Sequence, residues 1–169
     1  MKAKSIIALA LALLLGACMT APEPGPAAAP QAAREHAVYV IRHLQKAQGP
    51  DPSLTQEGAA NAQLLADMLE GEAIGAVYAT PTARAVQTGE PLARRLGLSV
   101  TPYDARDGTG LAASLAALDA PALVVGHSNT VGDLVSAFGG SPVPVLTEAD
   151  YGTLYRVDPD GSVTEIAVE

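Results

Sequence analysis

The stretch that decides the fold is Val38-Tyr39-Val40-Ile41-Arg42-His43. Its first four residues are all β-branched or aromatic, and a short apolar run of this kind predicts a buried strand. Open α/β sheets build their sites at the carboxyl ends of their strands. We therefore expect Arg42 and His43 to lie at the rim of a sheet, where the chain leaves the core.

A second apolar run, Ala122 to Gly126, also ends on a histidine, His127. Between the two runs, Val77 to Ala79 predicts another strand, and the helix that follows carries Arg84 in its first turn. Strands of this kind bring two arginines and two histidines to one rim. Guanidinium groups match phosphoryl oxygens, and an uncharged imidazole is a nucleophile. The residues therefore predict a phosphoryl site with one imidazole free to attack.

The rest of the chain alternates between strand and helix patterns, and Thr55 is a good N-cap for the first helix. Helices are expected over 55–69, 82–96, 110–118 and 130–138, strands over 74–79, 98–103 and 123–126, and a closing hairpin over 151–157 and 162–168. This alternation predicts an α/β three-layer sandwich, in which helices flank a mostly parallel central sheet.

Three segments carry a family resemblance: Arg42-His43, Thr80-Pro81-x-x-Arg84-Ala85-x-Gln87-Thr88 and Gly126-His127-Ser128-Asn129. Together, and in this order, they resemble the histidine phosphatase superfamily, which has the phosphoglycerate-mutase-like fold. The resemblance covers the chain from about Ala37 to its C-terminus. It implies hydrolysis of phosphomonoesters or phosphoramidates through a phosphohistidine, without a cofactor or metal. The chain lacks the insertions of the larger mutases, which favours a phosphatase.

The resemblance also implies a role for each matching residue. His43 is expected to be the nucleophile, and Arg42 and Arg84 are expected to clamp the phosphoryl oxygens. His127 is expected to donate a hydrogen bond to the same group. The permanent charge of the arginines then replaces the charge that a metal supplies in other phosphatases.

The residues after the Arg-His pair depart from the family pattern. A glycine commonly follows the pair, but Leu44 stands here, and Lys46 comes three residues after His43. Lys46 is either a contact to a distal anion of the substrate or an ordinary surface lysine. The sequence supports the two interpretations about equally.

The acid that protonates the leaving group is less clearly marked. The family uses an acidic residue after the third strand, and Asp104 is the first acidic residue there. Asp107 is the second choice, and Glu148 and Asp150 near the C-terminus are more distant alternatives.

The N-terminus has the pattern of a lipoprotein signal peptide. Two lysines precede an apolar run over 6–15, which is too short to span a bilayer, and Leu15-Gly16-Ala17 leads into Cys18. Cys18 is the only cysteine of the chain. We expect lipidation at Cys18, with an ordinary signal peptide or an uncleaved anchor as the alternatives.

The expected organisation is a signal peptide over 1–17, a lipidated Cys18 with a Pro/Ala-rich tether over 18–35, and a phosphatase domain over 36–169. A tether of this composition cannot form a packed element. It would hold the domain outside the cytoplasm, at an outer membrane facing the periplasm if the source is Gram-negative.

The charge of the chain restricts its partners. The formal net charge is −8, which argues against a nucleic-acid partner. The expected partners are a phosphorylated small molecule or phosphoprotein as substrate, and a membrane through the lipid. Two rival interpretations remain: a serine hydrolase with Ser128 as nucleophile, although no histidine follows Ser128, and a tethered protein that binds a phosphorylated ligand without turnover.

Overall fold

The computed structural model describes residues 34–168. The expected signal peptide, Cys18 and nearly all of the expected tether lie outside these residues. The described elements are β1 (Val38–Arg42), α1 (Gln56–Leu69), β2 (Ala76–Ala79), α2 (Ala83–Arg95), β3 (Val100–Pro102), α3 (Gly108–Ala116), β4 (Ala122–Gly126), α4 (Val131–Ala137), β5 (Thr153–Val157) and β6 (Val163–Ala167).

The strands form one mixed sheet of six, in the order β3-β2-β4-β1-β5-β6. The first four strands in this order are parallel, whereas β5 is antiparallel to both of its neighbours, β1 and β6. The most apolar strands, β1 and β4, lie in the middle and are buried along their whole length. Strands covered on both faces read as continuous apolar runs, which is why the sequence revealed them.

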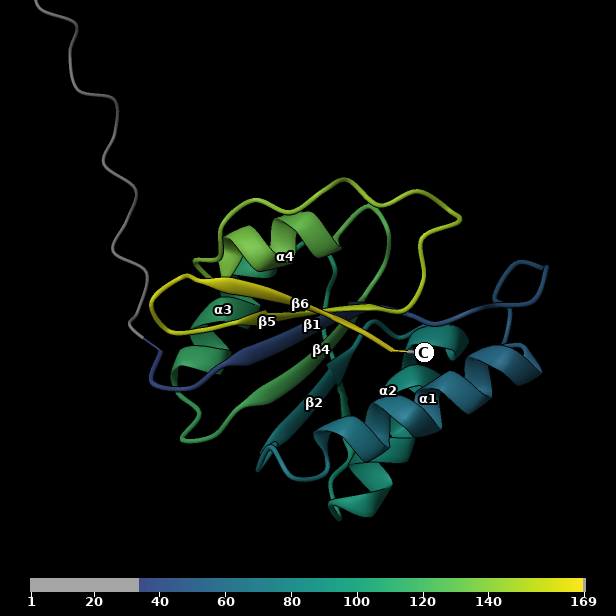
Figure 1. Cartoon of the computed structure of the whole chain (residues 1–169), viewed down its shortest axis with the longest axis horizontal. Helices are drawn as coiled ribbons and strands as arrows, with labels where there is room; N and C mark the ends of the chain where they lie inside the picture. Colours follow the sequence, from purple (N-terminus) through teal and green to yellow (C-terminus); the bar gives the residue numbers. More distant parts are fainter. Residues whose placement is uncertain (1–33, 169) are drawn as a thin grey trace, which may run out of the picture.

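Helices cover both faces of the sheet (Figure 1). One core contains Ile41, Leu65, Leu92 and Val125 and lies under α1 and α2. The other contains Val40, Val124, Leu134 and Phe138 and lies under α3 and α4. Neighbouring residues of β1 and β4 enter opposite cores because side chains alternate along a strand. The predicted three-layer α/β architecture is confirmed.

The helix starts and the hairpin follow local signals in the sequence. Thr55 is the N-cap of α1, and its hydroxyl accepts a hydrogen bond from the Gly58 amide at 3.0 Å. Position 58 requires a glycine, since a Cβ there would lie 2.2 Å from the Gln45 carbonyl oxygen. Gly161 takes a positive φ of 84° in the turn between β5 and β6, where glycine is favoured.

The ends of some elements differ from the prediction. The strand expected over 98–103 is shorter, because Gly97 has φ 68° and the Leu98 amide still bonds back to the carbonyl of Ala93 in α2. The strand expected to begin at residue 74 begins at Ala76. Ile74 nevertheless packs in the core with an exposed fraction of 5%. The apolar character of Ile74 correctly predicted that its side chain is buried, but it did not predict where strand pairing begins.

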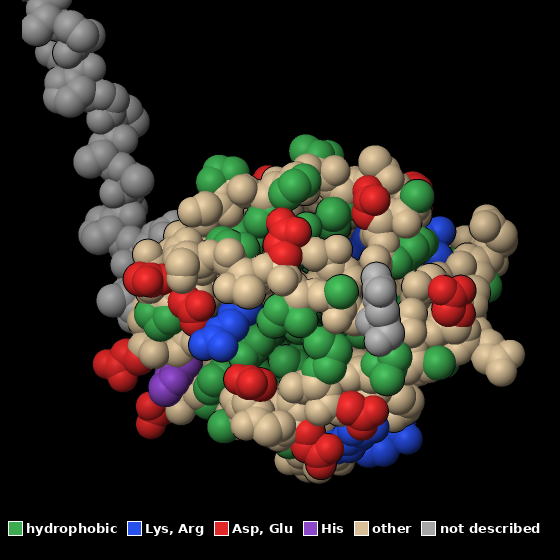
Figure 2. All heavy atoms as spheres, viewed as in Figure 1, with side chains coloured by type: hydrophobic (Ala, Val, Ile, Leu, Met, Phe, Trp, Pro, Cys, Tyr) green, Lys and Arg blue, Asp and Glu red, His purple; other side chains and the backbone are tan. Residues whose placement is uncertain are grey.

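Acidic side chains are scattered over the face of the domain seen in Figure 2, with hydrophobic side chains near its middle. Among residues 34–168, none of the helices is both long and apolar enough to cross a bilayer. The cationic side chains of the site, Arg42 and Arg84, lie at the carboxyl edge of the parallel strands.

Candidate phosphoryl-transfer site

The pairing of β1 with β4 brings two histidines together. Arg42 pairs with Gly126 in the register, and the His43 amide donates to the Gly126 carbonyl at 2.9 Å. The next residue of each strand end is therefore a histidine. The His43 and His127 ring centroids lie 5.1 Å apart, with 73° between the ring planes. The structure brings together the two histidines that the sequence predicted at one rim.

The His43 side chain is buried, with 2% exposed. Its Nδ1 lies 2.9 Å from the Leu44 carbonyl oxygen. A carbonyl can only accept, so Nδ1 carries the hydrogen and Nε2 has the free lone pair. Burial lowers the His43 pKa to about 4, and the nearby charges of His127, Arg42 and Arg84 act in the same direction, against the Leu44 hydrogen bond. At neutral pH the imidazole is uncharged, as a nitrogen nucleophile requires.

The Arg42 guanidinium is 1% exposed, and its Nη1 donates to two backbone carbonyls of the 147–150 segment. Its Nε and Nη2 are buried, and within residues 34–168 they make no hydrogen bond. These two nitrogens form one edge of the planar group, the edge that binds two oxygens of a phosphate or carboxylate side by side. The fork is thus fixed by the backbone on one side, while its other edge makes no hydrogen bond and has the Glu148 carboxylate 3.3 Å from Nη2.

Arg84 lies in the first turn of α2, as predicted. Its Nη1 lies 3.4 Å from an Asp51 carboxylate oxygen, and the same oxygen accepts the Ala83 amide at 3.0 Å. Asp51 therefore caps the helix, because Thr82 at the N-cap position makes no side-chain capping bond. Arg84 Nε is buried and makes no hydrogen bond with a described residue.

Two motif residues of α2 hold the surrounding loops. Thr88 is fully buried; its hydroxyl accepts from the Leu44 amide at 3.0 Å and donates to the Arg84 carbonyl at 2.8 Å. Gln87 accepts from the Leu54 amide at 2.8 Å. Thr88 therefore fixes the backbone beside His43 relative to α2. The sequence marked both residues only through the resemblance, since such loop contacts leave no periodic signal.

His127 leads into α4. Its amide donates to the Thr130 hydroxyl at 2.9 Å. Burial lowers the pKa of His127, and the charges of Arg84 and Arg42 lower it further, against a raising effect of Glu148. His127 also lines a pocket of about 610 Å³ whose other walls include Pro81, Pro102 and Tyr103.

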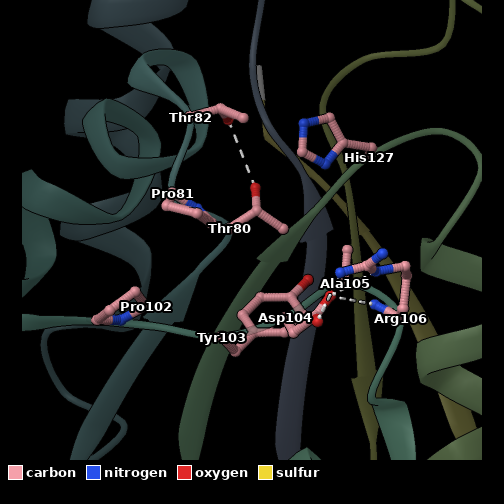
Figure 3. A pocket seen from close by; sticks show the side chains of 9 residues that line it. All are labelled: Thr80, Pro81, Thr82, Pro102, Tyr103, Asp104, Ala105, Arg106 and His127. Atoms are coloured by element: carbon pink, nitrogen blue, oxygen red, sulfur yellow. Dashed lines mark hydrogen bonds and ion pairs between the residues drawn. The ribbon is translucent and has the colours of Figure 1, made fainter.

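Asp104 lines the same pocket but is turned toward Arg106 (Figure 3). Arg106 donates to Asp104 through its backbone amide at 3.0 Å and through its guanidinium at 3.2 Å. These hydrogen bonds lower the Asp104 pKa, so the exposed group is a carboxylate at neutral pH. Asp107, the second choice, is the N-cap of α3, where it accepts from the Gly110 amide at 2.8 Å.

Glu148 is the carboxylate closest to the arginine fork. Its Oε2 lies 3.3 Å from Arg42 Nη2 and 3.8 Å from Lys46 Nζ, and its Oε1 accepts from the Ser128 hydroxyl at 3.1 Å. These contacts lower its pKa, the Ser128 hydrogen bond most and Arg42 next. A carboxylate thus stands where the open edge of Arg42 faces. From the sequence alone Glu148 is only a distant alternative, because it lies on an irregular exposed loop.

One group of three side chains among residues 34–168 could hold a metal: Glu35, His36 and Asp119. These residues precede β1 and β4, so they lie at the opposite edge of the sheet from His43. The group is away from the phosphoryl site.

Comparisons with known proteins agree with this arrangement. The model of the histidine phosphatase superfamily (branch 1) matches residues 38–106, which include Arg42, His43 and Arg84 but not His127. No curated protein matches the chain.

Solved structures share the fold. A structure of the protein histidine phosphatase SixA complexed with tungstate has a TM-score of 0.59 and 26% identity, and the match covers 77% of this chain and 94% of that one. A putative phosphohistidine phosphatase SixA from Agrobacterium tumefaciens has a TM-score of 0.56 and 22% identity, with coverages of 77% and 95%. A mycobacterial glucosyl-3-phosphoglycerate phosphatase has a TM-score of 0.58 and 16% identity, with coverages of 78% and 97%.

The folded domain thus has the phosphoglycerate-mutase-like architecture, as predicted. The resemblance read from the three segments is also confirmed, because the histidine phosphatase superfamily model matches residues 38–106 and the fold is similar to that of a protein histidine phosphatase.

Proposed function

We propose that the protein is a metal-independent phosphatase that transfers a phosphoryl group to His43 and then to water. The observation that carries the proposal is the state of the His43 side chain. It is buried and uncharged, its Nδ1 is held by a carbonyl so that Nε2 keeps the lone pair, and the charges of Arg42 and Arg84 are near enough to lower its pKa. A neutral nitrogen beside permanent positive charge can attack an anionic phosphoryl group.

In the first step, the His43 Nε2 lone pair forms a bond to phosphorus while the bond to the leaving oxygen or nitrogen breaks. The leaving group takes up a proton. In the second step, water attacks phosphorus, the phosphorus–nitrogen bond breaks, and inorganic phosphate is released with the imidazole restored. Arg42 and Arg84 stabilise the charge on the equatorial oxygens in both steps, and His127 donates a hydrogen bond to the same group.

Asp104 is our candidate for the leaving-group acid, because it lines the pocket with His127. The pKa values of Asp104, Glu148 and Asp150 are all lowered by their partners in the free protein. A carboxylate is a poor proton donor. An alkoxide leaving group depends more on a proton donor than an imidazole leaving group does. This favours phosphoramidates, with phosphomonoesters of good leaving groups as the second substrate class.

The similar proteins support both substrate classes. The structure with 26% identity is of a protein histidine phosphatase, and another is of a glucosyl-3-phosphoglycerate phosphatase. Lys46, at 3.8 Å from Glu148, lies near enough to the arginine fork to contact a second anionic group of a substrate. A phosphorylated histidine in a protein is our first choice of substrate.

The test is phosphate release by the full-length protein in detergent, from an aryl phosphate and from a phosphorylated histidine, with a chelator present. His43→Ala should lower the rate by about 10³-fold or more, since loss of a nucleophile removes the pathway. His36→Ala is the matched control, because His36 lies at the opposite edge of the sheet and pairs with Asp119. Equal rates for wild type and His43→Ala, or loss of activity with chelator, would contradict the proposal.

The rival, a protein that binds phosphate without turnover, predicts a different pattern: inorganic phosphate binds to the wild type, but neither substrate is hydrolysed.

We further propose that Cys18 is lipidated and that the domain faces the periplasm from the outer membrane. Mass spectrometry of the N-terminal peptide should show acyl chains on Cys18. A Cys18→Ser variant that still fractionates with the membrane would contradict this proposal.

A further inference from the structure

The C-terminal loop contributes more to the site than the carboxylate of Glu148. We propose that residues 147–151 position Arg42, so that the Nε/Nη2 edge of its guanidinium points at the phosphoryl group. This inference rests on the proposed function, since it concerns the residue that would bind the phosphoryl oxygens.

The first contact is a pair of backbone acceptors. Arg42 Nη1 donates to the Thr147 carbonyl at 2.7 Å and to the Asp150 carbonyl at 2.9 Å. Both hydrogens of Nη1 are therefore used, which fixes the rotation of the guanidinium plane. Nε and Nη2 have no hydrogen-bond partner among residues 34–168, and Nη2 lies 3.3 Å from the exposed Glu148 carboxylate. They form the edge that can bind two oxygens at once.

The second contact is an aromatic face. The centroid of the Tyr151 ring lies 4.1 Å from Arg42 Cζ, well within the range of a cation–π interaction. The same ring lies 6.0 Å from the His43 ring centroid. The carbonyls hold one edge of the guanidinium and the ring covers one face, so an anion can bind at the Nε/Nη2 edge, where the exposed Glu148 carboxylate lies in the free protein.

The two carbonyls are themselves held by a side-chain turn. The Asp150 carboxylate accepts from the Thr147 amide at 2.6 Å and from the Thr147 hydroxyl at 2.7 Å. The Asp150 amide also donates to the Thr147 carbonyl at 3.2 Å. Thr147 and Asp150 are therefore positioning residues that act on the anion only through Arg42.

Electrostatics and geometry make opposite predictions for Asp150. Removing its negative charge from beside an anion site should strengthen phosphate binding, because a repulsion is lost. Releasing the turn should weaken binding, because Arg42 loses its orientation. Weaker binding in Asp150→Ala therefore reports positioning rather than charge.

The experiment is calorimetric titration of the full-length protein in detergent with inorganic phosphate. Asp150→Ala, Thr147→Val and Tyr151→Leu should each weaken binding by about tenfold, the size typical of residues that orient a ligating group. Tyr151→Phe keeps the ring and should recover most of the affinity lost in Tyr151→Leu. Asp160→Ala is the matched control, since Asp160 holds a comparable turn by accepting the Ser162 amide at 2.9 Å, away from the site.

A double variant separates positioning from a general structural effect. In an Arg42→Met background, Asp150→Ala should cause no further weakening, because its effect passes through Arg42. If Arg42→Met does not fold, the same comparison is made with Arg42→Lys, which keeps the charge but lacks the fork. Unchanged or tighter phosphate binding in Asp150→Ala, or equal weakening in both backgrounds, would overturn the proposal.

Phosphate binding needs no turnover, so the two proposals can fail separately. A wild type that binds phosphate and responds to the turn variants, but hydrolyses nothing, refutes the phosphatase and keeps the positioning role. A wild type that hydrolyses substrate while the turn variants bind phosphate normally refutes the positioning role alone.

Discussion

The site joins two unlike regions of the molecule. One is the buried end of β1 and β4, where Arg42 and His43 are at most 2% exposed. The other is the exposed rim, where Asp104 and Glu148 have side chains that are 54% and 73% exposed. In the buried region, the low dielectric constant strengthens each electrostatic interaction, and the positions of the side chains are fixed. At the rim, water screens the charges, so the same kinds of contact contribute little.

This difference decides which substitutions should matter. Loss of a buried cation that faces the phosphoryl group should cost far more than loss of a rim carboxylate. Matched residues from the two regions can test that ordering.

Among substitutions that compare the two regions, the largest effect is expected for Arg84→Ala, with Arg94→Ala as its control. Both arginines belong to α2, but Arg84 is 17% exposed at the site, whereas Arg94 is 71% exposed and pairs with Glu90. Removing a preorganised donor to transition-state charge should lower kcat/KM for an aryl phosphate by about 10²–10³-fold. Similar losses in the two variants would mean that Arg84 acts as an ordinary helix charge.

Asp104→Asn should have a smaller effect that depends on the substrate. General acids contribute roughly 10²-fold or more where the leaving group needs a proton. We therefore expect about a 10²-fold loss with an alkyl phosphate and little change with an activated aryl phosphate, measured as kcat/KM. Glu148→Gln is measured in parallel. If its loss grows with the basicity of the leaving group while that of Asp104→Asn does not, Glu148 is the acid instead.

The pKa of His43 tests the buried region directly. NMR titration of the imidazole in the free protein should give a midpoint at about 4. The unfolded chain then takes up a proton near pH 6.5, whereas the native protein does not until about pH 4. Stability should consequently fall as the pH drops through this window, by about 1.4 kcal/mol per pH unit at most.

His43→Gln should remove this contribution to the pH dependence, as measured by denaturant unfolding at several pH values. An imidazole midpoint near 6.5 in the wild type would show that His43 is not desolvated, and the argument for a permanently neutral nucleophile would fail.

The smallest effect is expected for Glu148→Gln on phosphate affinity. The carboxylate neutralises part of Arg42 and Lys46 at distances of 3.3 Å and 3.8 Å, so its removal should tighten binding of inorganic phosphate. The gain should be about two- to fivefold, because the side chain is largely exposed and screened. Glu165→Gln, on strand β6, is the control for a general change of charge. Weaker binding in Glu148→Gln would show that the carboxylate supports the site instead of competing with the anion.

The contrast between the buried and the exposed region also explains which features could be predicted from the sequence. The apolar runs at β1 and β4 predicted a parallel sheet. Because Arg42, His43 and His127 end these runs, they were predicted to lie at one rim. Thr55 marked the start of α1, where its hydroxyl does bond to the Gly58 amide. Burial on both faces and capping both leave local patterns in a sequence.

The loop 147–151 leaves no such pattern. Thr147, Asp150 and Tyr151 contact Arg42 across more than a hundred positions of sequence, through backbone carbonyls and a ring face. Backbone acceptors have no residue signature, so no reading of composition or period could have assigned them. Asp104 and Arg106 are only two positions apart, but the effect of their pairing on the Asp104 pKa required the geometry.

The most direct test of the account is to trap the phosphoryl group on the protein. The full-length protein is mixed with an aryl phosphate, quenched in alkali within milliseconds, digested and analysed by mass spectrometry, with His127→Ala included to slow the second step. The account predicts an acid-labile, alkali-stable phosphate on the peptide that contains His43, and none in His43→Ala. Phosphate on another residue, or steady turnover with no phosphorylated histidine in either protein, would contradict it.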